Sequence, residues 1–302
     1  MLTLPTCFGV ERAVQPRVRR PGAPVLLILL AVAALECSSS ILPVSCCGVV
    51  VRVLGLMRVR NGGQGLMGVL DGLARWCDDI YVVDDRSTDG TAEVLRSHPR
   101  VTNVVHARPG LPGDPWLVPE SAGLELLYRM ADFCRPDWII MTDDDQALDV
   151  EGDLRARLAA LPGEVAGVRC ALVSSWNDPQ FPRMVPLMGA ATSMRCAIWR
   201  YRPGLKAGCK PLHNHHWPLN LTDHGRLEDI DGIRVVHSGW DTLDKRIARV
   251  KLYQRLDPDH VHNFGAAYDR ALLFGYRLDE LDRLKADYAR RAAAETAGTT
   301  PV

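Results

Sequence analysis

The sequence predicts an α/β domain built on a mainly parallel β-sheet. From Gly48 onward, short runs rich in β-branched residues alternate with segments whose apolar residues recur at helical spacing. This alternation is typical of βαβ units. Acidic residues follow several of the strand-like runs, and open parallel sheets bind their ligands at the carboxyl ends of their strands. With 302 residues, 47% of them hydrophobic, the chain can form one large domain or two small ones.

The first half of the pattern is regular. The expected strands are 49–57, 80–83, 101–105 and 138–141, and the expected helices are 66–76, 124–134 and 154–161. A short helix should follow the second strand, with Ser87 or Thr88 as its cap and Asp89 in its first turn. Prolines make 108–116 a loop.

The second half alternates less regularly. We expect a strand at 165–173, a loop at 176–186, a strand-rich segment at 188–201, a long loop at 206–231, a final strand at 233–236, and charged amphipathic helices at 241–256 and 278–290. The expected organisation is an N-terminal extension at 1–47, the main domain at 48–240 and a C-terminal helical segment at 241–302 that packs on it.

Composition narrows the classes of partner and compartment. Lys plus Arg and Asp plus Glu both number 36, so no net positive field attracts nucleic acid or an anionic membrane. The nine cysteines show no Cys-x-x-Cys and no disulfide-like spacing. They are expected to be reduced and mostly buried, which predicts a cytoplasmic location.

The N-terminal segment leaves two interpretations open. Arg17, Arg19 and Arg20 precede an apolar run at 24–35, which has the length of a secretory signal core and is shorter than the roughly 20 residues that span a bilayer. One interpretation is a targeting segment that associates the protein with a membrane. The other is a poorly structured extension over 1–47, including one produced by a misplaced start codon.

Three consecutive carboxylates, Asp143, Asp144 and Asp145, follow the strand expected at 138–141. A divalent cation held by carboxylates can neutralise a diphosphate and keeps positions open for its oxygens. In an extended segment Asp143 and Asp145 point to one side and Asp144 to the other, so the first and third are expected to bind Mn²⁺ or Mg²⁺. The alternative is an acidic turn that caps the next helix.

A second acidic pair, Asp84 and Asp85, ends the strand expected at 80–83. Acidic residues after strands accept hydrogen bonds from ribose in other nucleotide-binding folds, so this pair is expected to contact a base or its ribose. The alternative is a turn and helix cap without a ligand. Asp85 and Asp143 are 58 positions apart, and the two motifs together are more specific than either alone.

These motifs resemble those of the family-2 glycosyltransferases. Val83-Asp84-Asp85-Arg86-Ser87-Thr88-Asp89-Gly90-Thr91 is similar to that family's Val-Asp-Asp-Gly-Ser-Thr-Asp-Gly-Thr, and the aspartate triplet resembles its Asp-x-Asp metal motif. The resemblance covers about 51–258. It implies a three-layer α/β/α fold of the GT-A type with C-terminal helices, and metal-dependent transfer of a sugar from a nucleotide-diphosphate donor to a glycan, lipid or small-molecule acceptor.

The resemblance also implies further donor contacts. Arg58-Val59-Arg60-Asn61 is similar to the family's opening strand and Arg-Asn-Glu turn, which assigns Arg58, Arg60 and Asn61 to the donor, although Gly62 stands where Glu is usual. The triplet as a whole, including Asp144, is assigned to the donor as well, with Asp145 also catalytic. Gln146 replaces the Glu that often follows the triplet.

Two histidines gain roles from the same resemblance. The segment from Val235 to Trp240 is similar to the C-terminal part of bacterial members, where a histidine completes the metal site, so His237 is expected to be the third ligand. His213 is expected to contact the acceptor or the diphosphate. A histidine satisfied by hydrogen bonds at a strand end is the alternative for His237.

Other residues leave alternatives open. An inverting transfer needs a general base, for which Asp178 and Asp223 are the candidates by chain order, whereas a retaining enzyme needs no such base. A zinc site formed by His213, His215 and His216 is one alternative, but no cysteine or carboxylate lies at the spacing such a site needs. Trp176, Trp199 and Trp217 are candidates either for sugar stacking or for ordinary packing.

Two rival functions share parts of this pattern. A nucleotidyltransferase would use the same sheet and metal carboxylates, but it normally needs a Gly-rich loop with Arg or Lys for a triphosphate, and the Gly-rich stretch at 61–65 has no lysine beside it. A binding module that has lost its chemistry is the other rival. The intact aspartates favour an active transferase.

Overall fold

The computed structural model describes residues 51–107, 120–175, 193–209 and 213–260, together with four isolated helical positions, Arg283, Ala286, Arg290 and Ala293. The expected extension at 1–47, the loops at 108–116 and 176–186, and most of the helix at 278–290 lie outside these ranges. Within the described residues, no helix combines the length and the apolar character needed to cross a bilayer.

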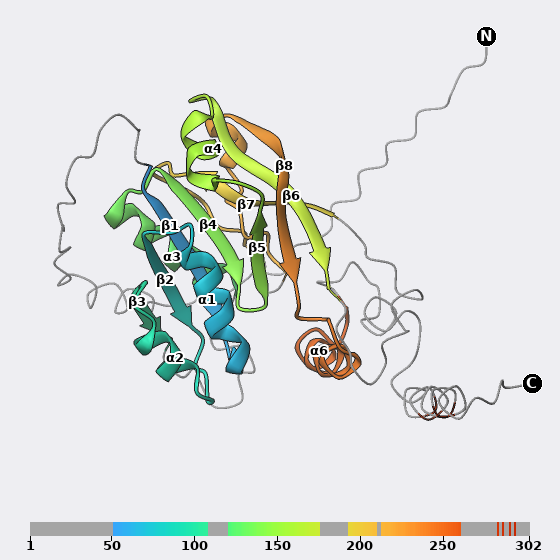
Figure 1. Ribbon diagram of the computed structural model, residues 1–302. Helices are drawn as coiled ribbons and strands as arrows, with labels where there is room; N and C mark the ends of the chain where they lie inside the picture. The colour runs from blue at the N-terminus through green and yellow to red at the C-terminus, as the bar shows by residue number, and fades with distance from the viewer. Residues whose placement is uncertain are drawn as a thin grey trace, which may run out of the picture. The chain divides into compact units, whose positions relative to one another are not determined.

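The described strands form one mixed sheet (Figure 1). They are β1 (Val53–Val59), β2 (Asp79–Asp84), β3 (Val101–His106), β4 (Trp138–Asp143), β5 (Gln146–Val150), β6 (Val165–Ser174), β7 (Ser193–Arg200) and β8 (Arg226–His237), in the order β3-β2-β1-β4-β7-β6-β8-β5. The neighbours in β3-β2-β1-β4 and the pair β6-β8 are parallel, and the other pairs are antiparallel. The predicted α/β fold with a mainly parallel sheet is confirmed.

Helices cover both faces of the sheet. The described helices are α1 (Leu66–Ala74), α2 (Thr91–Ser97), α3 (Glu120–Cys134), α4 (Leu154–Ala160) and α6 (Leu243–Leu256), with short 3₁₀ turns η2 (Gly63–Gly65) and η3 (Leu221–His224). Val53 and Met57 of β1 belong to the apolar core shared with α1, α2 and α4, whereas Leu54 and Leu56 belong to the core shared with α3. Because strand side chains alternate between faces, these two cores create the predicted three layers.

The sheet curls so that its fourth and last strands meet. Only Asp144 and Asp145 separate β4 from β5, although β5 occupies the far edge of the strand order, next to β8. The register of β5 with β8 places Gln146 opposite His237. The curl therefore brings the end of β8 to the aspartates that follow β4.

Two strand predictions were incomplete. Strand β5 was not predicted, because its five residues alternate buried and exposed over too short a length to stand out. Residues 226–231 were predicted to be a loop, whereas β8 spans twelve residues from Arg226 to His237. Most of that first half is polar and not buried, so it carries no hydrophobic signal, and the strand forms through its pairing with β6.

The predicted cap of α2 was wrong. The helix begins at Thr91, and the carboxylate of Asp89 accepts hydrogen bonds from the Thr91 amide (3.0 Å) and hydroxyl (2.5 Å). Ser87 instead donates its amide and hydroxyl to Asp84. Ser87 is occupied because the buried Asp84 carboxylate requires donors of its own.

Candidate metal and nucleotide site

Both acidic motifs lie at one edge of the sheet. β1 runs between β2 and β4, with Val59 opposite Asp84 on one side and Arg58 opposite Asp143 on the other. Neighbouring strands are about 4.8 Å apart, so the ends of β2 and β4 are separated by only about 10 Å across β1. The sheet therefore brings the motifs together as the sequence predicted.

The aspartate triplet is a tight turn rather than an extended segment. Asp143 ends β4, Asp144 and Asp145 form the turn, and Gln146 starts β5. Asp144 faces the segment after β1, since a Cβ on Gly62 would lie 3.4 Å from its Oδ2. Burial, together with the charges of Asp145 and Asp143, raises the pKa of Asp144 to about 7. Three carboxylates in one turn are thus costly to ionise without a cation.

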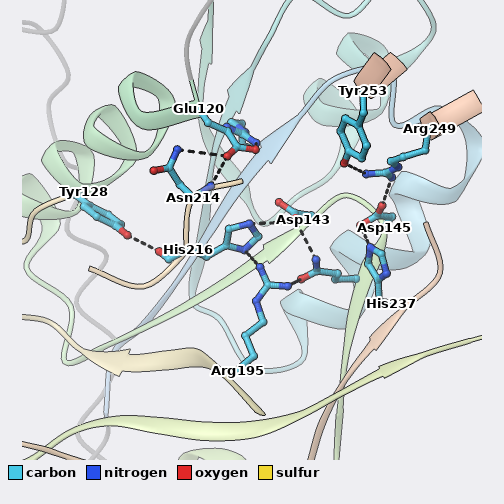
Figure 2. A network of polar contacts seen from close by, with 12 residues as sticks. Glu120, Tyr128, Asp143, Asp145, Arg195, Asn214, His216, His237, Arg249 and Tyr253 are labelled. Atoms are coloured by element: carbon cyan, nitrogen blue, oxygen red, sulfur yellow. Dashed lines mark hydrogen bonds and ion pairs between the residues drawn. The ribbon is translucent and has the colours of Figure 1, made fainter. Parts of the chain in front are cut away.

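Asp143 belongs to a closed ring of four side chains (Figure 2). Its Oδ2 accepts a hydrogen bond from Gln146 Nε2 (2.8 Å) and lies 3.2 Å from His216 Nε2. Arg195 closes the ring by donating to Gln146 Oε1 (2.9 Å) and to His216 Nδ1. Since β7 supplies Arg195 and the segment after it supplies His216, the ring ties the second half of the chain to the aspartate turn.

The ring defines the state of His216. Arg195 can only donate, so His216 Nδ1 accepts and the ring proton sits on Nε2, directed at Asp143. Burial and then the charge of Arg195 lower the pKa of His216 well below its ordinary value. Burial also raises the pKa of Asp143, with Asp145 adding to the rise and Arg195 opposing it. His216 is therefore neutral, and its protonated Nε2 lies 3.2 Å from Asp143 Oδ2.

Asp145 faces the opposite side of the turn, toward α6 and the end of β8 (Figure 2). Arg249 Nη2 lies 2.6 Å from its Oδ2, and His237 Nε2 lies 3.4 Å from its Oδ1. Burial alone would raise the pKa of Asp145, but His237 and Arg249 outweigh burial and hold it well below its usual range. Its Oδ1 is buried and has no hydrogen-bond partner among the described residues, so one acceptor of this carboxylate is suited to a ligand.

Gly239 lets the backbone after β8 pass close to Asp145. The amide and hydroxyl of Ser238 both donate to the Asp145 carbonyl, at 2.8 and 3.1 Å. A Cβ on Gly239 would overlap Asp145 Oδ2 and lie 2.8 Å from Arg249 Nη2. Any larger residue there would push the carboxylate out of place.

The expected metal ligands are only partly assembled. Within the described ranges, no three His, Cys, Asp or Glu side chains form a group that could hold a metal ion. Asp145 and His237 are the two expected ligands that lie side by side. His237 Nε2 is 3.4 Å from Asp145 Oδ1, and this Oδ1 has no hydrogen bond with a described residue. Such a spacing is roughly that of neighbouring ligands on one small cation. The carboxylate of Asp145 and the imidazole of His237 are suitable ligands for Mn²⁺ or Mg²⁺, and Asp143 lies at the other end of the same turn.

The Asp84-Asp85 turn is organised by its own neighbours. Asp84 Oδ1 accepts from Ser87, and its Oδ2 lies 2.8 Å from His106 Nδ1. Asp85 Oδ1 accepts two hydrogen bonds from Arg86, while its Oδ2 lies 3.9 Å from Arg60. Asp84 thus serves mainly to shape the turn, whereas within the described ranges Asp85 Oδ2 has only a distant ionic partner.

Other residues predicted to bind the nucleotide sugar lie on β1 or directly after it, at the same edge of the sheet. Arg58 Nη2 binds Glu120 at 2.8 Å, and burial, which would lower the pKa of Arg58, is outweighed by Glu120 and Asp143, which raise it. Asn61 adopts a left-handed conformation with φ of 54° and accepts from the Thr88 amide at 2.8 Å. Asn61 therefore joins the turns after β1 and β2, while the half-exposed Arg60 faces Asp85.

The three clustered histidines have separate partners. His213 packs edge-on against Tyr253, with ring centroids 4.9 Å apart, and His215 stacks on Trp217 at 4.3 Å. His216 belongs to the ring around Asp143. Since the three rings turn to different neighbours, they do not support the zinc alternative. His213 nevertheless lies on the α6 side of the site through Tyr253, which contacts Arg249 at 3.4 Å.

The structure excludes one of the tryptophans proposed to stack on a sugar and one of the two proposed general bases. Trp199 is fully buried and packs against Tyr128, so it belongs to the core and cannot stack on a sugar. Asp223 precedes β8 in η3, at the end of the twelve-residue strand opposite to His237, and so lies roughly 30 Å or more from the aspartate turn. The structure does not bring Asp223 to the site. Asp178 and Trp176 lie outside the described residues.

Several side chains at this site carry no sequence signal of their own. They are Glu120, Arg195, His216, Arg249 and Tyr253. The first four contact Arg58 or the segment 143–146 from distant parts of the chain, and Tyr253 contacts Arg249. Gln146 and Gly239 were visible as members of motifs, but their contacts become apparent only in three dimensions.

No protein-family model matches the chain. It is 59% identical over 241 residues to the uncharacterized proteins Mb3815c of Mycobacterium bovis and Rv3786c of Mycobacterium tuberculosis. The match takes in 80% of this chain and 59% of each relative. The chain thus spans about three fifths of the length of these curated relatives.

Three solved structures show weak likeness to the chain. The first is a mycobacterial protein, with 18% identity and a TM-score of 0.26 over 43% of this chain and 42% of that one. The second is glucosyl-3-phosphoglycerate synthase from Mycobacterium tuberculosis in complex with phosphoglyceric acid, with 17% identity and a TM-score of 0.27 over 45% of this chain and 48% of that one. The third is 4-diphosphocytidyl-2C-methyl-D-erythritol synthase, with 14% identity and a TM-score of 0.27 over 51% of this chain and 76% of that one. At these TM-scores the likenesses carry no functional argument, so function has to be argued from the residues of this chain.

Proposed function

We propose that this protein is a metal-dependent glycosyltransferase that uses a nucleotide-diphosphate sugar. The observation that carries the proposal is the aspartate turn: it crowds Asp143, Asp144 and Asp145 at the carboxyl edge of the sheet and leaves Asp145 Oδ1 buried without a hydrogen-bond partner in the described part of the chain. Such a carboxylate is suited to a cation. The acidic turn after β2 lies across only one strand, which is where a nucleoside joined to a metal-bound diphosphate would reach.

The residues suited to hold Mn²⁺ or Mg²⁺ are Asp145 and His237, with Asp143 from the other end of the turn. A carboxylate and imidazole set suits Mn²⁺ better than Mg²⁺, which prefers oxygen ligands. When bound, the cation would neutralise the charge that develops on the diphosphate as it leaves. This chemistry explains why the turn is strongly acidic.

The chain's own groups would orient the donor. Asp85, whose Oδ2 has only the distant Arg60 as a partner, is the proposed contact for the base or ribose, and Asp84 holds that turn in place through Ser87 and His106. Arg58, fixed by Glu120, provides positive charge between the two acidic turns. Arg60 and Asn61 border the nucleoside side of the same edge.

Two residues are proposed for the acceptor side of the site, one as a general base and one as a binding contact. An inverting transfer would need a carboxylate within hydrogen-bonding reach of the acceptor hydroxyl, and Asp178 keeps this role as a sequence prediction. Asp223 is not proposed, because β8 separates it from the aspartate turn. His213, beside Tyr253, remains the proposed contact for acceptor or diphosphate.

The released product tests the proposal directly. The full chain, with Mn²⁺, is offered UDP-, GDP- and ADP-sugars and, separately, nucleoside triphosphates with sugar phosphates, and nucleoside diphosphate and pyrophosphate are quantified. A glycosyltransferase, or slow donor hydrolysis by one, releases nucleoside diphosphate only when metal is present. Release of pyrophosphate from a triphosphate would identify a nucleotidyltransferase instead, and binding without any turnover would favour a silent module.

A further inference from the structure

Helix α6 is strongly basic and places one of its arginines, Arg249, next to the aspartate turn. Its basic residues are Lys245, Arg246, Arg249, Lys251 and Arg255, against the single acidic residue Asp244. The helix follows β8 and lies near the carboxyl ends of β6 and β8 in Figure 1. Of these basic residues, Arg249 reaches Asp145.

The contacts of Arg249 leave much of its guanidinium unused. Nη2 binds Asp145 Oδ2 at 2.6 Å, and Nη1 makes a long contact of 3.4 Å with the Tyr253 hydroxyl (Figure 2). A guanidinium has five N–H donors, so these two contacts with described residues use a minority of them. The side chain is also 31% exposed, compared with 16% for Asp145, and so retains access to solvent.

Two other arginines of the described residues near the turn are directed elsewhere. Arg58 is paired with Glu120 at 2.8 Å, and Arg195 is held by Gln146 and His216 on the Asp143 side. Arg249 therefore supplies positive charge on the Asp145 side. The absence of a side chain at Gly239 makes its approach possible, because a Cβ there would lie 2.8 Å from Nη2.

We infer that Arg249 is a binding residue for the donor's diphosphate, placed beside the Asp145 end of the metal site. This inference rests on the proposed function, since it takes Asp145 as a ligand of the cation. A diphosphate bound to that cation comes within reach of the neighbouring guanidinium, which is well suited to phosphate oxygens. Arg249 thus disfavours the cation alone, through like charge and competition for Asp145, and favours the cation together with the diphosphate.

This position predicts effects of opposite sign for one substitution. In Arg249→Met, the loss of the positive charge should strengthen binding of Mn²⁺ alone by about tenfold. The same loss should weaken Mn²⁺-dependent binding of a nucleoside diphosphate by about tenfold or more, because a charge-assisted contact is gone. A residue that merely held Asp145 in place would weaken both.

The test measures both affinities by calorimetry on the full chain, with MnCl₂ alone and then with UDP, GDP and ADP in saturating Mn²⁺. Arg255→Met removes the same charge from an exposed position at the end of α6 and should leave both affinities within about twofold. Arg249→Lys keeps the charge and should recover most of the diphosphate affinity. Arg249→Gln serves if Arg249→Met does not fold, as judged by circular dichroism.

Weaker Mn²⁺ binding in Arg249→Met, or diphosphate affinity equal to that of Arg255→Met, would overturn the assignment of Arg249 and leave the proposed function intact. A wild-type protein that binds none of the three nucleotides in the presence of Mn²⁺ would overturn the proposed function itself. The two failures are therefore distinguishable within one set of titrations.

Discussion

At the scale of single residues, the most important interactions are those that determine the pKa values of Asp143 and Asp145, at the two ends of the aspartate turn. Asp143 has two neutral neighbours, Gln146, which donates a hydrogen bond to it, and His216 at 3.2 Å, whereas Asp145 is held by the guanidinium of Arg249. The pKa of Asp143 is accordingly raised, chiefly by burial, while that of Asp145 is lowered despite burial. Two chemically identical side chains thus differ because their neighbours differ.

We expect the Nε2–H group of His216 to stabilise Asp143 across their 3.2 Å contact, and a substitution can separate this effect from the bulk of the side chain. His216→Leu removes the donor, and we expect Mn²⁺ affinity to fall by about tenfold, as for other residues that orient a metal ligand. His216→Gln can donate through its amide and should recover part of the loss. The exposed neighbour His215 provides the control, since His215→Gln should leave the affinity unchanged. Equal affinities for the Leu and Gln variants would contradict a donor role.

Gly239 is predicted to be intolerant of any side chain. Gly239→Ala would place a Cβ against Asp145 Oδ2, so the free energy of unfolding should fall by about 1–3 kcal/mol and Mn²⁺ affinity should drop. Gly163→Ala, at a site where a Cβ meets nothing within 4 Å, is the matched control. Urea unfolding and Mn²⁺ titration of both variants measure the difference, and a Gly239→Ala protein as stable as the control would disprove the close packing.

At the scale of elements, the turns after β1 and β2 are joined by hydrogen bonds. Asp89 Oδ1 accepts from Thr91 at the start of α2, and its Oδ2 accepts from the Gly63 amide at 3.1 Å. Asn61 makes a second link to Thr88. These links hold the proposed nucleoside side of the site as one unit, although most of the participating side chains are exposed.

Asp89→Ala should therefore lower the free energy of unfolding by about 1 kcal/mol at pH 7. The side-chain hydrogen bond from Thr91 is the main cause that lowers the pKa of Asp89. A lowered carboxyl pKa contributes stability above its unfolded-state pKa, and this contribution is lost as the pH falls through the folded-state pKa. The difference between wild type and variant should thus shrink in acid.

Urea unfolding at pH 7 and near pH 3 checks this dependence on pH. Glu93→Ala, which breaks an exposed ion pair with Arg96 in the same helix, should cost less than about 0.5 kcal/mol. A difference for Asp89→Ala that stays constant between the two pH values would show that its carboxylate charge is not involved.

The sequence patterns predict the elements better than they predict the contacts of the site. Alternation within β1 and helical spacing in α1 and α3 indicate the layers, and the placement of the two acidic motifs follows from parallel strands ending at one edge. The ring around Asp143 was not predictable, because Gln146 and Arg195 are 49 positions apart and neither belongs to a recognisable pair. Register and curl decide that contact, and both arise from the packing of the whole sheet.

At the scale of the whole molecule, the described cysteines show how the core is organised. Cys77, Cys134, Cys170 and Cys196 are buried free thiols, and Cys209 is exposed. Burial raises the pKa of Cys170 to about 11 and that of Cys196 to about 12, so these two remain protonated and unreactive at neutral pH. The prediction that the cysteines are mostly buried is confirmed for the described residues, and their reduced state stays a prediction.

Alkylation with iodoacetamide at pH 7.5, followed by peptide mapping, should therefore modify Cys209 much faster than the four buried cysteines in the native protein. All five should react at similar rates in urea, because unfolding removes the burial that protects them. Rapid native labelling of Cys170 or Cys196 would show that the sheet around β6 and β7 opens readily.

The curl of the sheet gives the molecule its proposed function, since it brings His237 from the end of β8 to the turn after β4. The most direct test is calorimetry of UDP, GDP and ADP binding, with and without Mn²⁺, to wild type and to Asp145→Ala. We predict that wild type binds one of these nucleotides tightly only with Mn²⁺, and that the variant loses this dependence on metal. Equal affinity of the two proteins in Mn²⁺ would contradict the metal site.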